Sequence, residues 1–208
     1  MYRSPAFAVD DADELVALAR AAAFGHLVVT GADDGLLSTP LPFVISDDGA
    51  LVRAHLARPN PVWKAAPCEA LLIVPVTDAY VSPSWYPSKR VDGKVVPTWN
   101  YEVVHAAGQL TSHDDPEWLA RQIRDLTDLH ESPRDQPWSV DDAPADYIAT
   151  MVKGIVGIEL AVTRLEGKRK LSQNRPEADV EGVIAALSEG DERDRRVAAA
   201  MRRPGKNR

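Results

Sequence analysis

Two short acidic turns, each ending in glycine, separate three apolar runs near the start of the chain. The turns span residues 31–35 and 46–49, and the runs span 26–30, 41–45 and 50–56. An Asp-Gly pair between β-prone runs predicts a hairpin, because glycine readily adopts the positive φ of tight turns. Strands joined by such short connections run antiparallel, since a parallel pair needs a much longer crossover.

The remaining sequence adds more strands and several helices. Apolar runs predict strands at 69–76, 98–110 and 155–165, and helical spacing predicts helices after Asp11 and at 116–130, 145–151 and 176–187. About six antiparallel strands, with helices at the periphery and a C-terminal helix, predict an α+β, mainly β fold. We expect a small closed or split β-barrel. Alternating βαβ units and a glycine-rich phosphate loop are both missing, which argues against a Rossmann domain.

Charge is distributed unevenly along the 208 residues. The net charge is −7, yet residues 191–208 hold seven Lys/Arg and three Asp/Glu, which leaves −11 on the rest. We expect a single domain over 1–190 and a basic, flexible tail over 191–208. A body with this much negative charge is repelled by the phosphate backbone of DNA. Direct DNA binding is therefore disfavoured.

The cellular setting follows from what the sequence lacks. It has no apolar run near the roughly 18 residues that a membrane span needs. Its N-terminus lacks the apolar region of a signal peptide. Cys68 is the single cysteine, which excludes an internal disulfide framework. We expect a cytoplasmic protein without a membrane partner.

An aromatic loop is the most unusual segment. Residues 82–89 read SPSWYPSK and residues 95–101 read VVPTWNY. Loops are usually built from small polar residues. Aromatic rings fixed between prolines cost little entropy to order and present flat, amphipathic faces. This loop is expected to bind a planar ligand or another subunit.

Two further segments are candidates for binding an anion. Asn60 is a good N-cap before Pro61, and Arg58 and Lys64 lie close in sequence, so this turn suits one phosphate. An ordinary capped turn with solvated cations is the alternative. Residues 166–175 combine four cations with three hydrogen-bonding side chains, and this segment is either a ligand site or a solvated basic loop.

The histidines do not form a metal site. His26, His55, His105, His113 and His130 lack the spacing of a metal-binding set. His55 and His105 lie in predicted strands, where a neutral imidazole is able to ligate a haem iron. No nucleophile stands out, because no serine lies in an elbow motif.

These motifs together resemble the PaiB family, the FMN-binding negative transcriptional regulators. The resemblance covers nearly the whole chain and rests on the SPSWYPSK and KVVPTWNY runs, on HLAR with Asn60 and Trp63, on Leu126-Thr127 with His130-Glu131, and on KLSQNR at 170–175. The family is similar to the flavin-binding split barrels related to pyridoxamine-phosphate oxidase. That similarity implies a homodimer with FMN in the groove between two barrels.

The resemblance also implies roles for individual residues. Arg53, Asn60 and Lys64 would hold the phosphate. Trp85 to Lys89, with Thr98, Asn100 and Tyr101, would flank the flavin ring or the dimer seam. Lys170, Ser172 and Gln173 would close the site. No catalytic residue and no metal site is predicted, apart from His55 as an iron ligand if haem is bound.

Three functions are compatible with this sequence. The first is a transcriptional regulator that acts through flavin or another small molecule. The second is an FMN-dependent oxidoreductase, in which the cofactor carries the chemistry. The third is a haem-binding enzyme that degrades haem or forms an N–N bond, as piperazate synthases do. Whether the chain is an enzyme stays open at this point.

Overall fold

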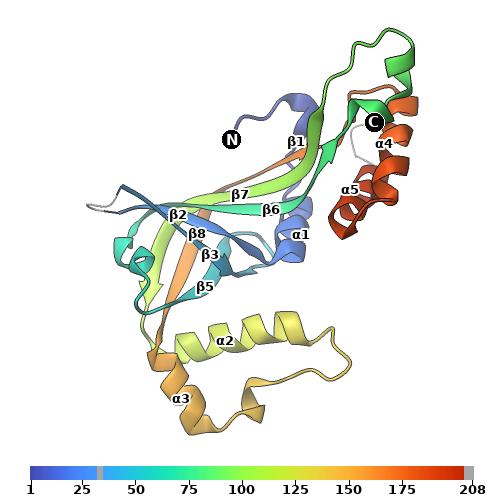
Figure 1. Ribbon diagram of the computed structural model, residues 1–208. Coiled ribbons are helices and arrows are strands. Elements are labelled where there is room, and N and C mark those ends of the chain that lie inside the picture. The colour runs from blue at the N-terminus through green and yellow to red at the C-terminus, as the bar shows by residue number, and fades with distance from the viewer. Residues whose placement is uncertain (32–34, 204–208) are drawn as a thin grey trace. The chain divides into compact units, whose positions relative to one another are not determined.

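The computed structural model describes residues 1–31 and 35–203. Figure 1 shows the arrangement of its elements. The helices are α1 (Ala12–Ala22), α2 (Pro116–Glu131), α3 (Ala145–Lys153), α4 (Glu177–Ser188) and α5 (Glu192–Arg202). The strands are β1 (Ala8–Val9), β2 (Phe24–Gly31), β3 (Gly35–Pro42), β4 (Val44–Ile45), β5 (Leu51–Ala57), β6 (Cys68–Val81), β7 (Thr98–His113) and β8 (Ile155–Lys170).

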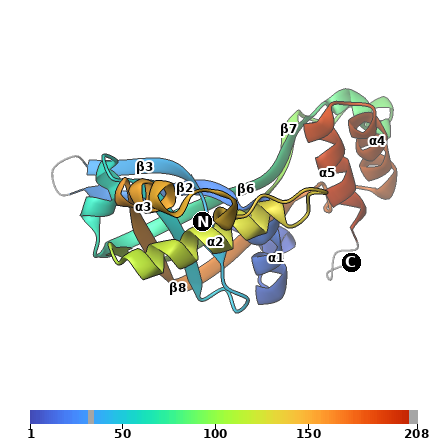
Figure 2. The same cartoon turned by 90° about the horizontal axis from the view of Figure 1, so that it is seen from below.

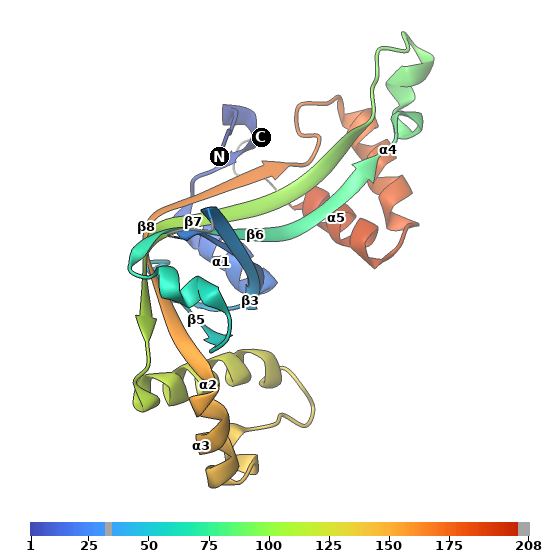
Figure 3. The same ribbon diagram turned by 60° about the vertical axis from the view of Figure 1, so that its left-hand side comes forward.

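The strands form one sheet in the order β3-β2-β6-β7-β8-β5-β4, with β1 paired to β8. The registers of β2 with β3, β2 with β6 and β5 with β8 are all antiparallel. This arrangement confirms the predicted α+β class. The structure describes eight strands where about six were expected, because the run at 41–45 is divided between β3 and β4 and because β1 is only two residues long. The long strands β6 and β7 are clear in Figure 3.

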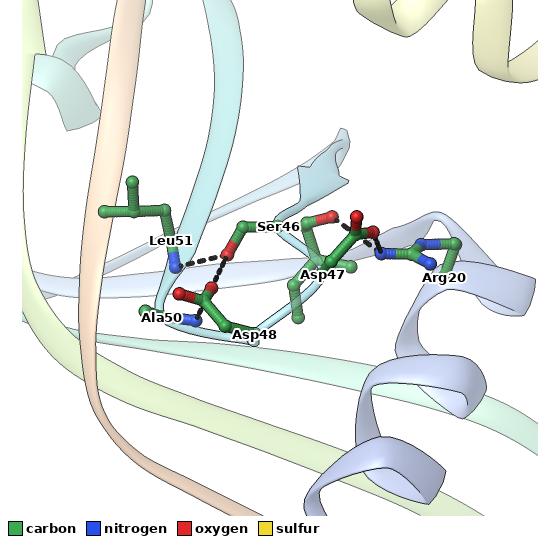
Figure 4. A network of polar contacts seen from close by, with 7 residues as sticks. Arg20, Ser46, Asp47, Asp48, Ala50 and Leu51 are labelled. Carbon is green, nitrogen blue, oxygen red and sulfur yellow. Dashed lines mark hydrogen bonds and ion pairs between the residues drawn. The ribbon is translucent and has the colours of Figure 1, made fainter.

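The second acidic turn shows how the sequence specifies a hairpin (Figure 4). Gly49 has φ +71°, which glycine adopts without steric cost. Asp48 Oδ1 accepts hydrogen bonds from Ser46 Oγ at 2.6 Å and from the Ala50 amide at 3.0 Å, and these bonds lower the pKa of Asp48. Arg20 Nη2 lies 2.7 Å from Asp47, which ties the turn to α1.

The first acidic turn lies partly outside the described residues, at 32–34. Its flanking strands pair without interruption from Phe24 opposite Pro42 to Gly31 opposite Gly35. The predicted hairpin is therefore confirmed by the register of the two strands.

The chain forms two compact units. The first unit contains residues 1–10, 75–103 and 167–208, and the second unit contains 11–74 and 104–166. Strands β6, β7 and β8 each contribute residues to both units. Residue 190, where composition suggested the domain edge, is not a boundary of either unit.

The second unit has a packed apolar interior. Eight buried residues from six strands surround a space of only about 10 Å³: Leu27, Leu41, Val52, Ala54, Leu72, Leu110, Ile158 and Leu160. A space of that size is about one water-sized sphere. The apolar interior formed by these side chains is therefore closely packed and stabilises the fold.

The first unit buries its apolar side chains between the aromatic loop and the last two helices. Tyr86 packs in one cluster with residues of α4 and α5, and Trp85 lies against that cluster. Figure 1 shows α4 and α5 side by side. Within the described residues, no helix combines the length and apolar character needed to cross a membrane.

The prediction of a flexible tail over 191–208 is wrong for residues 192–202, which form α5. Asp191 caps this helix by accepting a hydrogen bond from the Asp194 amide at 2.9 Å. Val197, Ala198, Ala200 and Met201 are buried on one side of the helix, and the arginines lie on the other. Its basic composition thus reflects the exposed face of an amphipathic helix rather than disorder.

Candidate functional site

Arg53 and His55 lie on the same face of β5 in the second unit. Arg53 Nη2 forms an ion pair with Asp125 of α2 at 2.6 Å, and its partner across the strands is Glu159. The Nδ1 atom of His55 is buried and has no hydrogen-bond partner among the described residues. Burial lowers the pKa of His55, so this imidazole is neutral at neutral pH.

Asn60 caps η2 (Pro61–Ala65), a short 3₁₀ helix that contains Lys64. The Asn60 side chain accepts a hydrogen bond from the Val62 amide and donates one to Thr39 Oγ1, both at 3.0 Å. Lys64 is exposed, with its Nζ 5.9 Å from the Trp63 ring. The predicted capped turn is therefore confirmed. The side-chain amide of Asn60 is already used in hydrogen bonds, and the charge of Arg53 is already neutralised by Asp125.

Helix α2, seen from below in Figure 2, packs against β5, the strand that carries His55. Gly157 lies opposite His55 in the sheet, and the Trp118 ring occupies the space that a side chain at Gly157 would need. One turn further on, the Gln122 side chain is fully buried, and neither of its amide atoms has a partner among the described residues. Sequence reasoning missed Gln122, because apolar spacing along a helix does not mark a polar side chain as buried.

The aromatic loop is a fixed part of the first unit. It contains η3 (Pro83–Trp85) and η4 (Pro87–Arg90). Asp179 of α4 accepts hydrogen bonds from the amide and the hydroxyl of Ser88, at 3.0 and 2.7 Å. Trp85 is half-buried, whereas Lys89 is exposed and donates to Ser84 Oγ at 3.1 Å. The loop is therefore held in one conformation by α4.

Five of the remaining predicted residues come together at the end of β8. Lys170 Nζ donates to Thr98 Oγ1 at 2.5 Å and to the Trp99 carbonyl at 2.6 Å. Ser172 Oγ donates to the buried Asn100 side chain at 3.1 Å. Gln173 donates to the Arg169 carbonyl and accepts from the Leu171 amide, both at 2.7 Å. These bonds fix the turn that follows β8.

Three cations, Lys168, Lys170 and Arg175, form a cation cluster at this end of β8. None of them pairs with a carboxylate in the described part of the chain. Lys168 Nζ lies 5.5 Å from the Tyr101 ring, and Arg175 lies 5.0 Å from the Tyr86 ring. Burial lowers the pKa of Lys170, and the like charges of Lys168 and Arg175 lower it further. Such crowding of positive charge favours an anionic ligand.

Arg169, between the two lysines, has a different role. Its Nε donates to Glu102 at 2.7 Å, and the Glu102 side chain is completely buried. Arg203 lies 3.7 Å from the other Glu102 oxygen. The predicted basic loop at 166–170 is thus the last part of β8, with Arg169 in a structural ion pair.

An aromatic row extends across the first unit beside the cation cluster. It consists of Tyr80, Trp99 and Tyr101. Tyr80 and Trp99 contact edge to face with centroids 6.0 Å apart, and each is nearly half exposed. Aromatic faces beside unpaired cations suit a planar ligand that carries an anionic group. Sequence reasoning included Lys168 and Arg175 in the candidate segment 166–175 and named Tyr101, but it missed Tyr80.

Comparison with known proteins gives a family. Residues 1–164 match the protein family described as "Putative FMN-binding domain". The chain is 33% identical over 190 residues to "Protease synthase and sporulation protein PAI 2" of Bacillus subtilis, which covers 90% of this chain and 89% of that protein.

Solved structures show the same fold at low sequence identity. The flavocytochrome Anf3 from Azotobacter vinelandii aligns with a TM-score of 0.56 at 17% identity, over 78% of this chain and 69% of that chain. The FAD and haem binding protein from Mycobacterium smegmatis aligns with a TM-score of 0.56 at 13% identity, over 86% and 79%. The chain therefore belongs to the PaiB family, with the split-barrel fold of flavin-binding proteins.

Proposed function

We propose that this protein binds FMN, with the phosphate at the cation cluster and the flavin ring near the aromatic row of the first unit. The cation cluster carries the proposal, because Lys168, Lys170 and Arg175 lie close together without a carboxylate partner in the described chain. FMN offers the complementary pair of features, a planar ring and a phosphate dianion. The family description supports flavin as the cofactor.

The position of the phosphate differs from the one that the resemblance implied. At Arg53, an incoming phosphate would compete with Asp125 for the guanidinium. At the cation cluster, an incoming phosphate breaks no ion pair and relieves the repulsion among three like charges. For that reason we place it at β8 rather than at Arg53, Asn60 and Lys64.

A comparison of two flavins tests this assignment. FMN and riboflavin share the ring, but riboflavin lacks the phosphate. In each of the single variants Lys168→Met and Lys170→Met, we expect FMN affinity to fall about tenfold or more, because one charge-assisted contact is lost. Riboflavin affinity should stay at the wild-type value, measured by quenching of flavin fluorescence.

Lys153→Met serves as the matched control, because Lys153 is an exposed lysine of α3 in the second unit. It should bind both flavins as the wild type does. Equal losses of FMN and riboflavin in the β8 variants would contradict the phosphate assignment. A wild-type protein that binds neither flavin would contradict the function itself.

Haem is a second candidate, and His55 is the residue that favours it. Its imidazole is kept neutral by burial, and only a neutral imidazole ligates iron. Haem reconstitution of the wild type should then give a Soret band that is altered in His55→Ala. A Soret band identical in the two proteins would exclude His55 as the ligand.

We further propose that any regulatory role operates through the bound small molecule rather than through contact with DNA. The net charge of −7 supports this, as do the arginines of α5, of which Arg193 and Arg196 pair with Asp78 and Glu192. Titration with duplex DNA of its own upstream region at two salt concentrations tests the point. Tight, salt-sensitive binding would contradict it.

A further inference from the structure

A cavity of about 390 Å³ lies in the first unit, between the start of α5 and the edge of β6. Its volume is within the usual range for sites that bind small molecules. Val76, Thr77 and Asp78 line it from β6, and Glu192, Arg193 and Arg196 line it from α5. We call it the α5 cavity. None of these residues belongs to the cation cluster.

The charges that line the α5 cavity are balanced. Arg193 pairs with Asp78, and Arg196 pairs with Glu192. Both arginine side chains are more than 60% exposed, at 61% for Arg193 and 67% for Arg196. Exposed pairs of this kind contribute little to stability, so a ligand is able to exchange with them at low cost.

This balance determines which ligand the cavity favours. A simple anion that binds Arg196 leaves Glu192 without its partner, and a simple cation that binds Glu192 leaves Arg196 without one. A molecule that carries a carboxylate and an ammonium group provides a partner for both side chains. Charge complementarity therefore discriminates against ligands with only one of the two groups.

The two sides of β6 differ in what they offer the cavity. The hydroxyl oxygen of Thr77 is buried and has almost no accessible surface, so a ligand in the cavity does not reach it. Asp78 lies on the opposite face of the strand from Thr77, because successive side chains alternate, and it pairs with Arg193 of α5. The guanidinium of Arg193 lies 5.9 Å from the Trp99 ring.

We propose that the α5 cavity binds a small zwitterion of the amino-acid class. The ligand's carboxylate pairs with Arg196 and its ammonium group with Glu192. An aliphatic side chain of the ligand contacts Val76. The site shares no lining residue with the proposed flavin site, although Arg193 lies beside Trp99 of the aromatic row.

Three probes of matched length test the proposal by isothermal titration calorimetry. Norleucine carries both charged groups, hexanoate lacks the ammonium group, and pentylamine lacks the carboxylate. We expect norleucine to bind the wild type at least about tenfold more tightly than either analogue. Equal affinity for hexanoate and norleucine would overturn the proposal in favour of a simple anion site, and failure of norleucine to bind would overturn it outright.

Variants at the lining assign the contacts. Glu192→Gln should weaken norleucine about tenfold and bring its affinity close to that of hexanoate, whereas Arg196→Gln should weaken both. Thr77→Val should leave norleucine affinity unchanged, because the Thr77 hydroxyl is not accessible from the cavity. Arg195→Gln is the control, since Arg195 is exposed on the same helix and does not line the cavity. Norleucine binding that is unchanged in Glu192→Gln and Arg196→Gln would overturn the assignment.

Discussion

Four arginines of the second unit and the cation cluster of the first unit differ in how their charges are paired. In the second unit, four arginines each pair with an aspartate at 2.5 to 2.7 Å, namely Arg20, Arg53, Arg58 and Arg124. In the first unit, Lys168 and Lys170 flank Arg169, which alone of the three pairs with a carboxylate, the buried Glu102. The difference shows that a count of basic residues does not locate an anion site. What matters is which cations the fold leaves without a counter-charge.

Among the substitutions considered, removing the buried carboxylate of Glu102 should have the largest effect on stability. Glu102→Leu leaves the largely buried Arg169 without its carboxylate, and we expect the free energy of unfolding to fall by about 3 to 5 kcal/mol. Chemical denaturation measures the change. The double variant Glu102→Leu/Arg169→Leu should recover part of the loss, because no buried charge then remains unpaired. A double variant less stable than the single one would contradict this view of the pair.

Gln122→Leu tests a buried group of the second unit that is polar rather than charged. The substitution replaces a buried amide with an apolar side chain of similar size. Each unpartnered buried polar group costs about 1 to 3 kcal/mol, so we expect the free energy of unfolding to rise by at least about 1 kcal/mol. A fall instead would show that solvent satisfies this amide in the folded protein.

His55 predicts a pH dependence of stability. Its pKa in the folded protein is below the ordinary value of 6.5, so the unfolded chain binds the proton first as the pH falls. The contribution of His55 is therefore fully present above pH 6.5 and is lost progressively below it. In His55→Leu, the free energy of unfolding should fall less steeply between pH 7 and pH 5. Some slope should persist, because burial also lowers the pKa of His105.

Asp125→Asn tests the paired Arg53 of the second unit, and it should have the smallest effect on the free energy of unfolding. It leaves Arg53 without its counter-charge, and because the pair is partly exposed we expect a loss of only about 0 to 1 kcal/mol. If the phosphate binds at β8, the FMN affinity of this variant should equal that of the wild type. A marked gain in FMN affinity, absent for riboflavin, would return the phosphate to Arg53.

Much of the fold was predictable from local sequence signals. The acidic turns predicted the hairpins, and good N-caps such as Asp11 and Asp115 predicted the starts of α1 and α2. Helix α5 was missed because its arginines dominated the composition, although Asp191 and the apolar spacing from Val197 to Met201 were both readable. Local sequence signals thus predicted most of the fold. The error at α5 arose because the charge of the segment was given more weight than its apolar periodicity.

The site was less predictable, because it depends on long-range pairing. Arg53 and Asp125 are 72 residues apart, and nothing local indicates that this arginine is neutralised while Lys168 is not. The unpartnered amide of Gln122 likewise depends on how α2 lies on β5 and β8. Residue types near a binding site were therefore available from the sequence, but their charge state and their partners were not.

Gly182 of α4 has a consequence for how this family can change over time. A Cβ atom at this position would lie 2.2 Å from the Trp85 carbonyl oxygen, so the helix approaches the loop too closely for any side chain. The loop and the helix are separated by almost a hundred positions, yet the path of the loop requires glycine in the helix. A chimera that imports the aromatic loop from a relative should therefore fold only when residue 182 stays glycine.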